Sequence, residues 1–379
     1  MKKLLPEVCT IQYGFPFDSA KFSDSNGMPL IRIRDVVRGY SETYTTEEYK
    51  SEYIVHENDL LIGMDGEFNI AKWGKTPALL NQRVCRLAPK DSIDKDYLFY
   101  FMPIALKRIE EKTPFVTVKH LSAKELNKIE IPVLPLEEQR KIAETLSKVD
   151  ELIAFRDQQL AKLDELVKAR FVEMFGNPSN NSLGFPYEPL SNCLLSIENG
   201  KSFVCSNDMR QEENPAILKL SAVTYGVYQQ DENKAILDSS MFVKSAEVHK
   251  GDLLFTRKNT PELVGMCAYV NDTAPNLMMP DLIFRLNTNE KINKIFLWKL
   301  INHEFFRGKI QNIATGSAKS MSNISKERLE KLAIILPPLH LQNDFAALVE
   351  RVDQQKQTIQ QSLEKLELMK KALMQEYFG

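Results

Sequence analysis

The chain has 379 residues, of which 43% are hydrophobic and 26% are charged, and its formal net charge is −2. This composition is typical of a soluble globular protein with two or three domain cores, and it excludes a strongly basic nucleic-acid-binding domain. No apolar run is long enough for a membrane span, and Pro6 and Glu7 interrupt the N-terminal segment, so we expect a cytoplasmic protein without a secretion signal. The five cysteines lie far apart, which predicts no metal or redox site.

Residues 1–134 are expected to form a first domain of mixed α and β structure. Residues 30–34 alternate apolar and basic side chains, which predicts a strand with Arg32 and Arg34 on one face. Residues 59–63 predict a short apolar strand that runs into a loop at 64–76. The polar and aromatic residues of this loop include Asn69, Lys72, Lys75 and Trp73, and we expect Trp73 to be exposed.

The rest of this domain predicts a strand at 81–87 and a helix that begins near residue 96. Lys119 and His120 then precede Ser122 and Glu125, a pair with the spacing of a helix capping box. A strand at 129–133 leads out of the domain.

A long helix is predicted at 135–176, because forty residues pass without an internal proline or glycine and the apolar residues fall three and four apart. A shift of 203 residues brings the segment back at 338–379, without a gap, so the chain is a duplication. The residues expected to pack one helix on the other are Leu146, Val149, Ile153, Leu160, Leu163 and Val167 in the first copy, and Val349, Val352, Ile359, Leu363, Leu366 and Leu373 in the second. Arg156, Arg170, Lys356 and Lys370 also fall on this stripe, with their stems along the seam and their charged ends in solvent.

Residues 177–337 repeat the order of the first domain with different loops. Residues 217–220 predict a strand that carries Lys219, and a strand at 252–256 runs into Arg257, Lys258 and Asn259. Strand 282–286 and helix 295–300 follow, and Lys319 and Ser320 precede a capped helix at 325. Two copies of one scaffold with different loops suit two different binding surfaces.

The order of segments predicts an α+β fold with an approximate two-fold axis. A helix of about 40 residues spans roughly 60 Å. Because the ends of a domain usually lie close together, the second long helix should run back along the first, antiparallel. The expected architecture is therefore a domain at 1–134, a spacer helix at 135–176, a second domain at 177–337 and a second spacer helix at 338–379.

The chain resembles the specificity subunits of type I restriction-modification systems. The resemblance is carried by Leu-Pro-Leu-Glu-Glu-Gln-Arg-Lys-Ile-Ala at 134–143 leading to Val149-Asp150, and by Leu-Pro-Pro-Leu at 336–339 with Gln342 leading to Val352-Asp353. Residues 29–36 and 118–122 also look like that family. The second helix departs from the pattern, since Leu-His-Leu-Gln-Asn-Asp replaces the Glu-Glu-Gln-Arg-Lys of the first, so the two helices need not present equal surfaces to two partner copies.

The resemblance implies two target recognition domains, each of which reads one half of a bipartite DNA sequence. The paired helices would set the distance between the halves and contact methyltransferase subunits, expected in two copies. Those subunits would hold S-adenosylmethionine and methylate adenine, and a motor nuclease subunit would join for restriction. This chain itself would bind no cofactor, and no membrane.

Candidate DNA contacts follow from residue type and place in the predicted loops and strands. They are Arg32, Arg34, Asn69, Lys72, Lys75, Lys119, Lys219, Arg257, Lys258, Asn259, Lys319 and Ser320. Arginine pairs naturally with guanine and asparagine with adenine, and lysines near a helix N-terminus can reach phosphates. Each residue also has a plain structural alternative: the arginines could form the solvated face of a strand, the loop residues an ordinary surface, and His120 a structural contact.

No catalytic motif is found in the sequence. Asn177-Pro178-Ser179-Asn180 and Asn214-Pro215-Ala216 lack the second proline and the aromatic residue that an amino-methyltransferase needs, and no nucleotide-binding or metal-ligand motif occurs. We therefore predict a non-catalytic subunit. Two alternatives remain: a coiled-coil adaptor that joins proteins without reading DNA, and an enzyme with an unfamiliar site.

Overall fold

The computed structural model describes residues 1–112, 119–316 and 321–379, which divide into two compact units. The first unit contains Met1–Asp157 and Gln360–Gly379, and the second contains Gln158–Ile359. Both mix helices with small sheets, so the α+β prediction is confirmed. No helix in the described ranges is both long and apolar enough to cross a bilayer.

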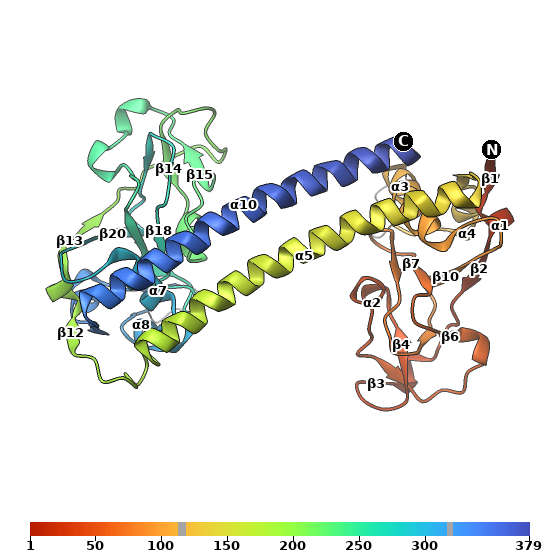
Figure 1. Ribbon diagram of the computed structural model, residues 1–379, viewed down its shortest axis with the longest axis horizontal. Coiled ribbons are helices and arrows are strands. Elements are labelled where there is room, and N and C mark those ends of the chain that lie inside the picture. The colour runs from red at the N-terminus through yellow and green to blue at the C-terminus, as the bar shows by residue number, and fades with distance from the viewer. Residues whose placement is uncertain (113–118, 317–320) are drawn as a thin grey trace. The chain divides into compact units, whose positions relative to one another are not determined.

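The first unit is built around a four-stranded antiparallel sheet with the order β2-β10-β7-β8. These strands are Cys9–Tyr13, Val84–Pro89, Leu60–Gly63 and Asn69–Lys72, and Figure 1 shows β7 and β10 side by side. A second sheet, β3-β5-β4-β9-β6, comprises Phe22–Ser23, Tyr44–Thr45, Met28–Ile31, Ala78–Leu80 and Ile54–Val55. The other strands and α-helices of the globular part are β1 (Lys2–Leu4), α1 (Leu5–Val8), α2 (Ile33–Arg38), α3 (Lys95–Lys112), α4 (Ala123–Leu126) and β11 (Glu130–Pro132), where β1 pairs with β11.

The second unit has an equivalent four-stranded sheet with the order β13-β20-β16-β18. Its strands are Leu194–Asn199, Ile283–Thr288, Leu253–Thr256 and Cys267–Tyr269. The other strands are β12 (Tyr187–Pro189), β14 (Ala216–Leu218), β15 (Asn233–Ala235), β17 (Lys258–Asn259), β19 (Leu277–Met278), β21 (Ser322–Asn323) and β22 (Ala333–Ile335). The short helices are α6 (Ser221–Thr224), α7 (Lys294–Asn302), α8 (Glu304–Asn312) and α9 (Lys326–Glu330).

The two units share their framework in detail. The strands β4 and β9 pair in parallel in the first unit, as do β14 and β19 in the second. Gly14 and Gly200 occupy the same close approach, where an added Cβ would lie 2.0 Å from the Asn81 carbonyl oxygen and 2.1 Å from that of Pro280. The ion pair Arg86–Asp59 at 3.0 Å in the first sheet is matched by Arg285–Asp252 at 2.9 Å in the second.

Two 40-residue helices, α5 (Leu136–Phe175) and α10 (Leu339–Phe378), match the repeat found in the sequence. Each helix contributes one part to each unit. In the second unit, Asp164 pairs with Lys356 at 2.6 Å and Phe171 packs on Phe345, so the helices run antiparallel there.

In the first unit, Lys370 pairs with Asp150 at 2.6 Å. All twelve residues predicted to pack between the helices are buried or half-buried. Among the charged residues on the stripe, Lys356 and Lys370 each form an ion pair with an aspartate of the other helix. Arg170 instead pairs with Glu173 of its own helix at 2.7 Å.

The last turn of each long helix packs on one helix of a globular domain, α3 in the first unit and α7 in the second. Phe378 packs on Tyr97 and Phe101 of α3, with ring centroids 5.1 and 5.8 Å away. Its counterpart Phe175 packs on Phe296 of α7 at 4.8 Å. Core packing thus explains the repeated phenylalanine at the end of each long helix.

Three elements expected from the sequence are wrong. The strand predicted at 30–34 ends at Ile31, and Arg32 and Arg34 lie at the start of α2 instead. The reason is Asp35, whose carboxylate accepts the Arg32 backbone N–H at 2.8 Å and so caps a helix that the alternation could not reveal. The strand predicted at 217–220 likewise ends at Leu218, so Lys219 falls outside it, before α6.

The loop predicted at 64–76 contains strand β8, which pairs with β7 and includes Asn69 and Lys72. Trp73 is only 2% exposed, which corrects the expected exposure, and its indole N–H donates to the Thr76 carbonyl at 2.7 Å. A buried indole with its polar group satisfied contributes to the core rather than to a binding surface.

Candidate nucleic-acid interface

The first unit gathers several polar segments at one edge of its four-stranded sheet. The register pairs Val84 with Gly63 and Cys85 with Tyr13, so the end of β7, the start of β10 and the end of β2 meet there. The turn after β7 is tied to two other segments, because the Met64 N–H donates to the Arg83 carbonyl at 2.9 Å and the Met64 carbonyl accepts from the Leu121 N–H at 2.7 Å. We call this the first recognition edge.

Four of the predicted DNA contacts lie at or next to this edge. A Cβ on Gly63 would lie 3.0 Å from Asn69 Oδ1 and 3.2 Å from Ile33, which places the start of α2, with exposed Arg32 and Arg34, against the β7–β8 turn. Lys119 lies beside the same turn, since its carbonyl accepts the Gly66 N–H at 2.9 Å. Its ammonium, however, donates to the Glu110 carbonyl at 2.8 Å and is therefore already occupied.

Lys72 lies at the opposite end of β8, where it pairs with Leu60 in the register. Its ammonium forms an ion pair with Asp96 at 2.9 Å and lies 5.0 Å from the centre of the Phe99 ring. The sequence had grouped Lys72 with Asn69 in one loop, and the structure separates them by the length of a strand. Lys75 is exposed beyond the end of β8.

The second unit has an equivalent edge around Arg257, which follows β16. The Arg257 N–H donates to the Leu282 carbonyl at 2.9 Å, and its carbonyl accepts from Ile324 N–H at 2.8 Å, the same pair of bonds that Met64 makes in the first unit. The Arg257 guanidinium lies 5.3 Å from the Phe284 ring centre. We call this the second recognition edge.

The other candidates in the second unit are less available. Asn259 is 7% exposed, donates to Thr224 Oγ1 at 3.0 Å and accepts the Thr260 N–H at 2.9 Å. Its amide therefore already has partners within the protein, and the expected adenine contact stays a prediction. Lys258 is half-buried in β17, and Lys219 forms an ion pair with Glu232 at 3.7 Å. Lys319 and Ser320 lie outside the described residues.

Two features of the molecule were missed by the sequence analysis. The first is Arg83, in the turn between β9 and β10, whose side chain is 55% exposed and bonds to Asp65 at the first recognition edge. No local pattern singles it out, because the turn is defined by pairing between distant strands.

The second is a pair of buried glutamines at the start of the long helices, Gln139 and Gln342, both 0% exposed. Gln139 accepts the Asp94 N–H at 2.8 Å and donates to the Leu134 and Ser92 carbonyls at 2.7 and 3.1 Å. Gln342 makes the matching bonds to Asn293, Pro337 and Lys291 at 2.9, 2.8 and 3.3 Å. The repeated Pro-Leu-x-x-Gln motif was the signal that could have revealed this bridge.

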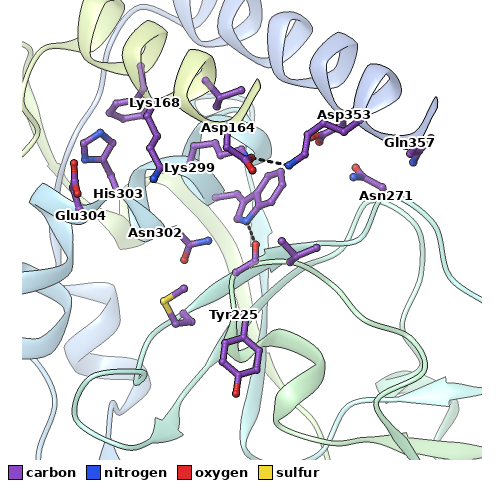
Figure 2. Close-up of a pocket in the computed structure, with 17 residues that line it drawn as sticks. Asp164, Lys168, Tyr225, Asn271, Lys299, Asn302, His303, Glu304, Asp353 and Gln357 are labelled. Atoms are coloured by element: carbon purple, nitrogen blue, oxygen red, sulfur yellow. Dashed lines mark hydrogen bonds and ion pairs between the residues drawn. The ribbon is translucent and has the colours of Figure 1, made fainter. Parts of the chain in front are cut away.

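A cavity of about 470 Å³ lies in the second unit between α5, α7, α10 and the turn after α6. Figure 2 shows Asp164, Lys299, His303 and Tyr225 around the cavity. Lys356, which forms the ion pair with Asp164, also lines it. Burial lowers the pKa of Lys299 to about 8, and burial raises the pKa of Asp353. None of the predicted DNA contacts lines this cavity, so we treat it as part of the junction between the helices and the domain.

The described residues contain no group of three or more side chains suited to hold a metal ion. Cys9, Cys85, Cys193 and Cys267 are buried and free, and Cys205 is half-buried and free. Burial raises the pKa of the Cys9 thiol to about 12, which makes it a packing residue rather than a nucleophile.

Comparisons with known proteins agree with this architecture. A family model described as the type I restriction modification DNA specificity domain matches residues 1–165 and 194–368. The EcoBI specificity subunit of Escherichia coli is 42% identical over 164 residues, which cover 43% of this chain and 34% of that protein. The MjaVIII specificity subunit of Methanocaldococcus jannaschii is 24% identical over 385 residues, which cover 91% of this chain and 87% of that protein.

Among solved structures, the S subunit of a type I restriction-modification system from M. genitalium is similar with a TM-score of 0.64 and 14% identity, over 100% of this chain and 96% of that one. At this identity the likeness concerns the fold. Two α+β units, each matched by a DNA specificity domain, define a protein that contributes sequence specificity rather than catalysis. The chain belongs to the family of type I restriction-modification specificity subunits.

Proposed function

We propose that this chain reads a bipartite DNA target, one half with each globular domain, and directs adenine methylation by partner subunits. The observation that carries the proposal is that the two units share their strand framework but differ in the side chains at their recognition edges. The two units share strand order, glycine contacts and glutamine bridges, yet the position of Arg83 at the first edge is Leu282 at the second, and that of Met64 is Arg257. Equal scaffolds with unequal edges suit two different half-sites.

Charge supports a dependence on partners. The chain carries 49 basic and 51 acidic residues, and three of the lysines predicted to contact DNA, Lys72, Lys119 and Lys219, are paired with carboxylates. Non-specific DNA affinity comes mainly from phosphate neutralisation. The chain therefore supplies base discrimination, and methyltransferase subunits supply much of the attraction to the backbone, along with S-adenosylmethionine.

The two long helices provide the surfaces for those partners. At the start of α5, Glu137, Glu138 and Arg140 are exposed, whereas the matching positions of α10 carry His340, Leu341 and Asn343. We propose two methyltransferase copies that meet unequal surfaces, and a motor nuclease in the restriction complex. The complex would act in the cytoplasm. The alternative of an adaptor without DNA readout has no support among the relatives described above.

An exchange of domains tests the proposal. Residues 177–337 are replaced by the corresponding domain of a relative, and the chimera is expressed with the methyltransferase subunits in a host that lacks other adenine methylases. Sequencing of modified bases should show a split motif in which only one half changes. A change in both halves, or in neither, contradicts the assignment of one half-site to each domain.

A further inference from the structure

Three side chains from separate segments meet at the first recognition edge. Asp65, in the turn after β7, accepts a hydrogen bond from Arg83 Nη1 at 2.6 Å through Oδ2, and its Oδ1 lies 2.5 Å from His120 Nδ1. The Asp65 side chain is 15% exposed, whereas those of Arg83 and His120 are 55% and 51% exposed. The carboxylate therefore lies beneath two donors that face solvent.

The backbone fixes this arrangement. Arg83 has a φ of 72°, a left-handed conformation that side-chain-bearing residues rarely adopt and that glycine or asparagine would fill with less strain. The hydrogen bonds of Met64 to Arg83 and of Gly66 to Lys119 hold the three segments together. An arginine that persists in such a conformation at a functional edge suggests a role for its side chain.

The guanidinium retains donors for a ligand. Of its five N–H groups, the described contacts use the Nη1 group alone, on Asp65. Two of the remaining N–H groups can present the parallel fork that matches O6 and N7 of guanine in the major groove. Asp65 also neutralises the arginine, so the pair contributes orientation and discrimination more than general attraction to phosphates.

The cluster belongs to one domain only. Equivalent backbone bonds place Leu282 at the position of Arg83 and Arg257 at that of Met64 in the second unit. The second edge therefore cannot form the same contact between an arginine and an aspartate, and Arg257 lies against the Phe284 ring instead. Whatever this cluster recognises lies in one half of the target.

We propose that Arg83 reads a guanine in the first half of the DNA target and that Asp65 is the positioning residue that holds it. This inference rests on the proposed function above, because it requires the first recognition edge to face DNA. His120 shares the same carboxylate and limits the rotation of Asp65.

The test uses the complete complex of this chain with its methyltransferase subunits. The main variant is Arg83→Gly, because glycine tolerates the left-handed backbone and the fold should be retained. The second variant is Asp65→Asn. The control is Arg38→Gln, which breaks the exposed ion pair between Arg38, the last residue of α2, and Glu42. Affinity is measured at several salt concentrations for the wild-type target, for duplexes with single base-pair changes, and for unrelated DNA.

Arg83→Gly should weaken binding to the wild-type target by about ten- to a hundred-fold and remove discrimination at one G·C pair of one half. Asp65→Asn should lower discrimination at the same base pair while binding to unrelated DNA becomes tighter, since one negative charge is lost. A merely structural role for Asp65 would not produce this opposite pair of changes. The control should leave both quantities unchanged.

Unchanged discrimination in both variants, or a uniform loss on every duplex, would overturn the inference. If the wild-type complex methylates a split target and the variants methylate the same target sequence, the inference about Arg83 is wrong and the proposed function stands. If the wild-type complex does not methylate a split target, the proposed function fails and the inference fails with it.

Discussion

The glutamine bridge should be among the most sensitive points of the fold. In Gln342→Met the side-chain volume is nearly kept, but the Asn293 N–H and the carbonyls of Pro337 and Lys291 lose their partner inside the protein. A hydrogen bond contributes about 1 kcal/mol net, and a buried group left unsatisfied costs about 1–3 kcal/mol. We expect a loss of about 3–5 kcal/mol in the free energy of unfolding, which is a large part of the 5–15 kcal/mol typical of a domain.

Chemical denaturation with urea, followed by circular dichroism, measures this loss. Gln139→Met provides a second, independent case in the other unit and should cost a similar amount. Gln361→Met is the matched control, because Gln361 is also repeated in the first helix, as Gln158, but is exposed. Losses below about 1 kcal/mol for the buried pair, or an equal loss for Gln361→Met, would refute the assignment of the bridge.

Two further predictions concern backbone contact and pH. Gly200→Ala should destabilise the protein by about 1–3 kcal/mol in the same assay, because the new Cβ would clash with the Pro280 carbonyl. Gly308→Ala, on α8, should instead stabilise the protein by about 0.5–1 kcal/mol, because its Cβ has open space and alanine favours a helix. Since burial lowers the pKa of Lys299 from 10.5 to about 8, the folded state binds fewer protons than the unfolded state between these values. Stability should therefore rise with pH across that window, and Lys299→Met, measured by denaturation at pH 7.5 and 9.5, should reduce this rise; an unchanged pH dependence would contradict it.

The sequence predicted the parts of the fold that depend on local periodicity. The forty-residue helices, the capped helices at Ser122 and Ser325 and the strands predicted at 59–63, 252–256 and 282–286 were recovered because spacing and capping are read directly along the chain. The strand predicted at 30–34 was wrong, because five alternating residues fit a strand as well as the start of a helix capped by Asp35.

The candidate site was harder to predict because its contacts are long-range. Lys72, Lys119 and Lys219 carry the right charge for DNA, but each is paired with a carboxylate that lies outside its own strand or loop. Conversely, Arg83 was overlooked, since only the pairing of β7 with β10 brings it to Asp65. Residue type predicted which chemistry to look for, and tertiary contacts decided which residues remain available for it.

The number of positions between equivalent residues of the two halves increases along the chain. The equivalent pairs, in chain order, are Gly14 and Gly200, Leu60 and Leu253, Asp94 and Asn293, and Ser122 and Ser325, which are 186, 193, 199 and 203 positions apart. The second unit therefore has longer connections before β16, between β16 and α7, and between α7 and α9, while the sheet order is kept. The middle connection includes the turn after β7 or β16, where Asp65 or Arg257 lies. In this middle connection a difference in length and a difference in side chains coincide at the recognition edge, as expected if the copies diverged in what they read while the glutamine bridges and helix contacts held each domain to its helices.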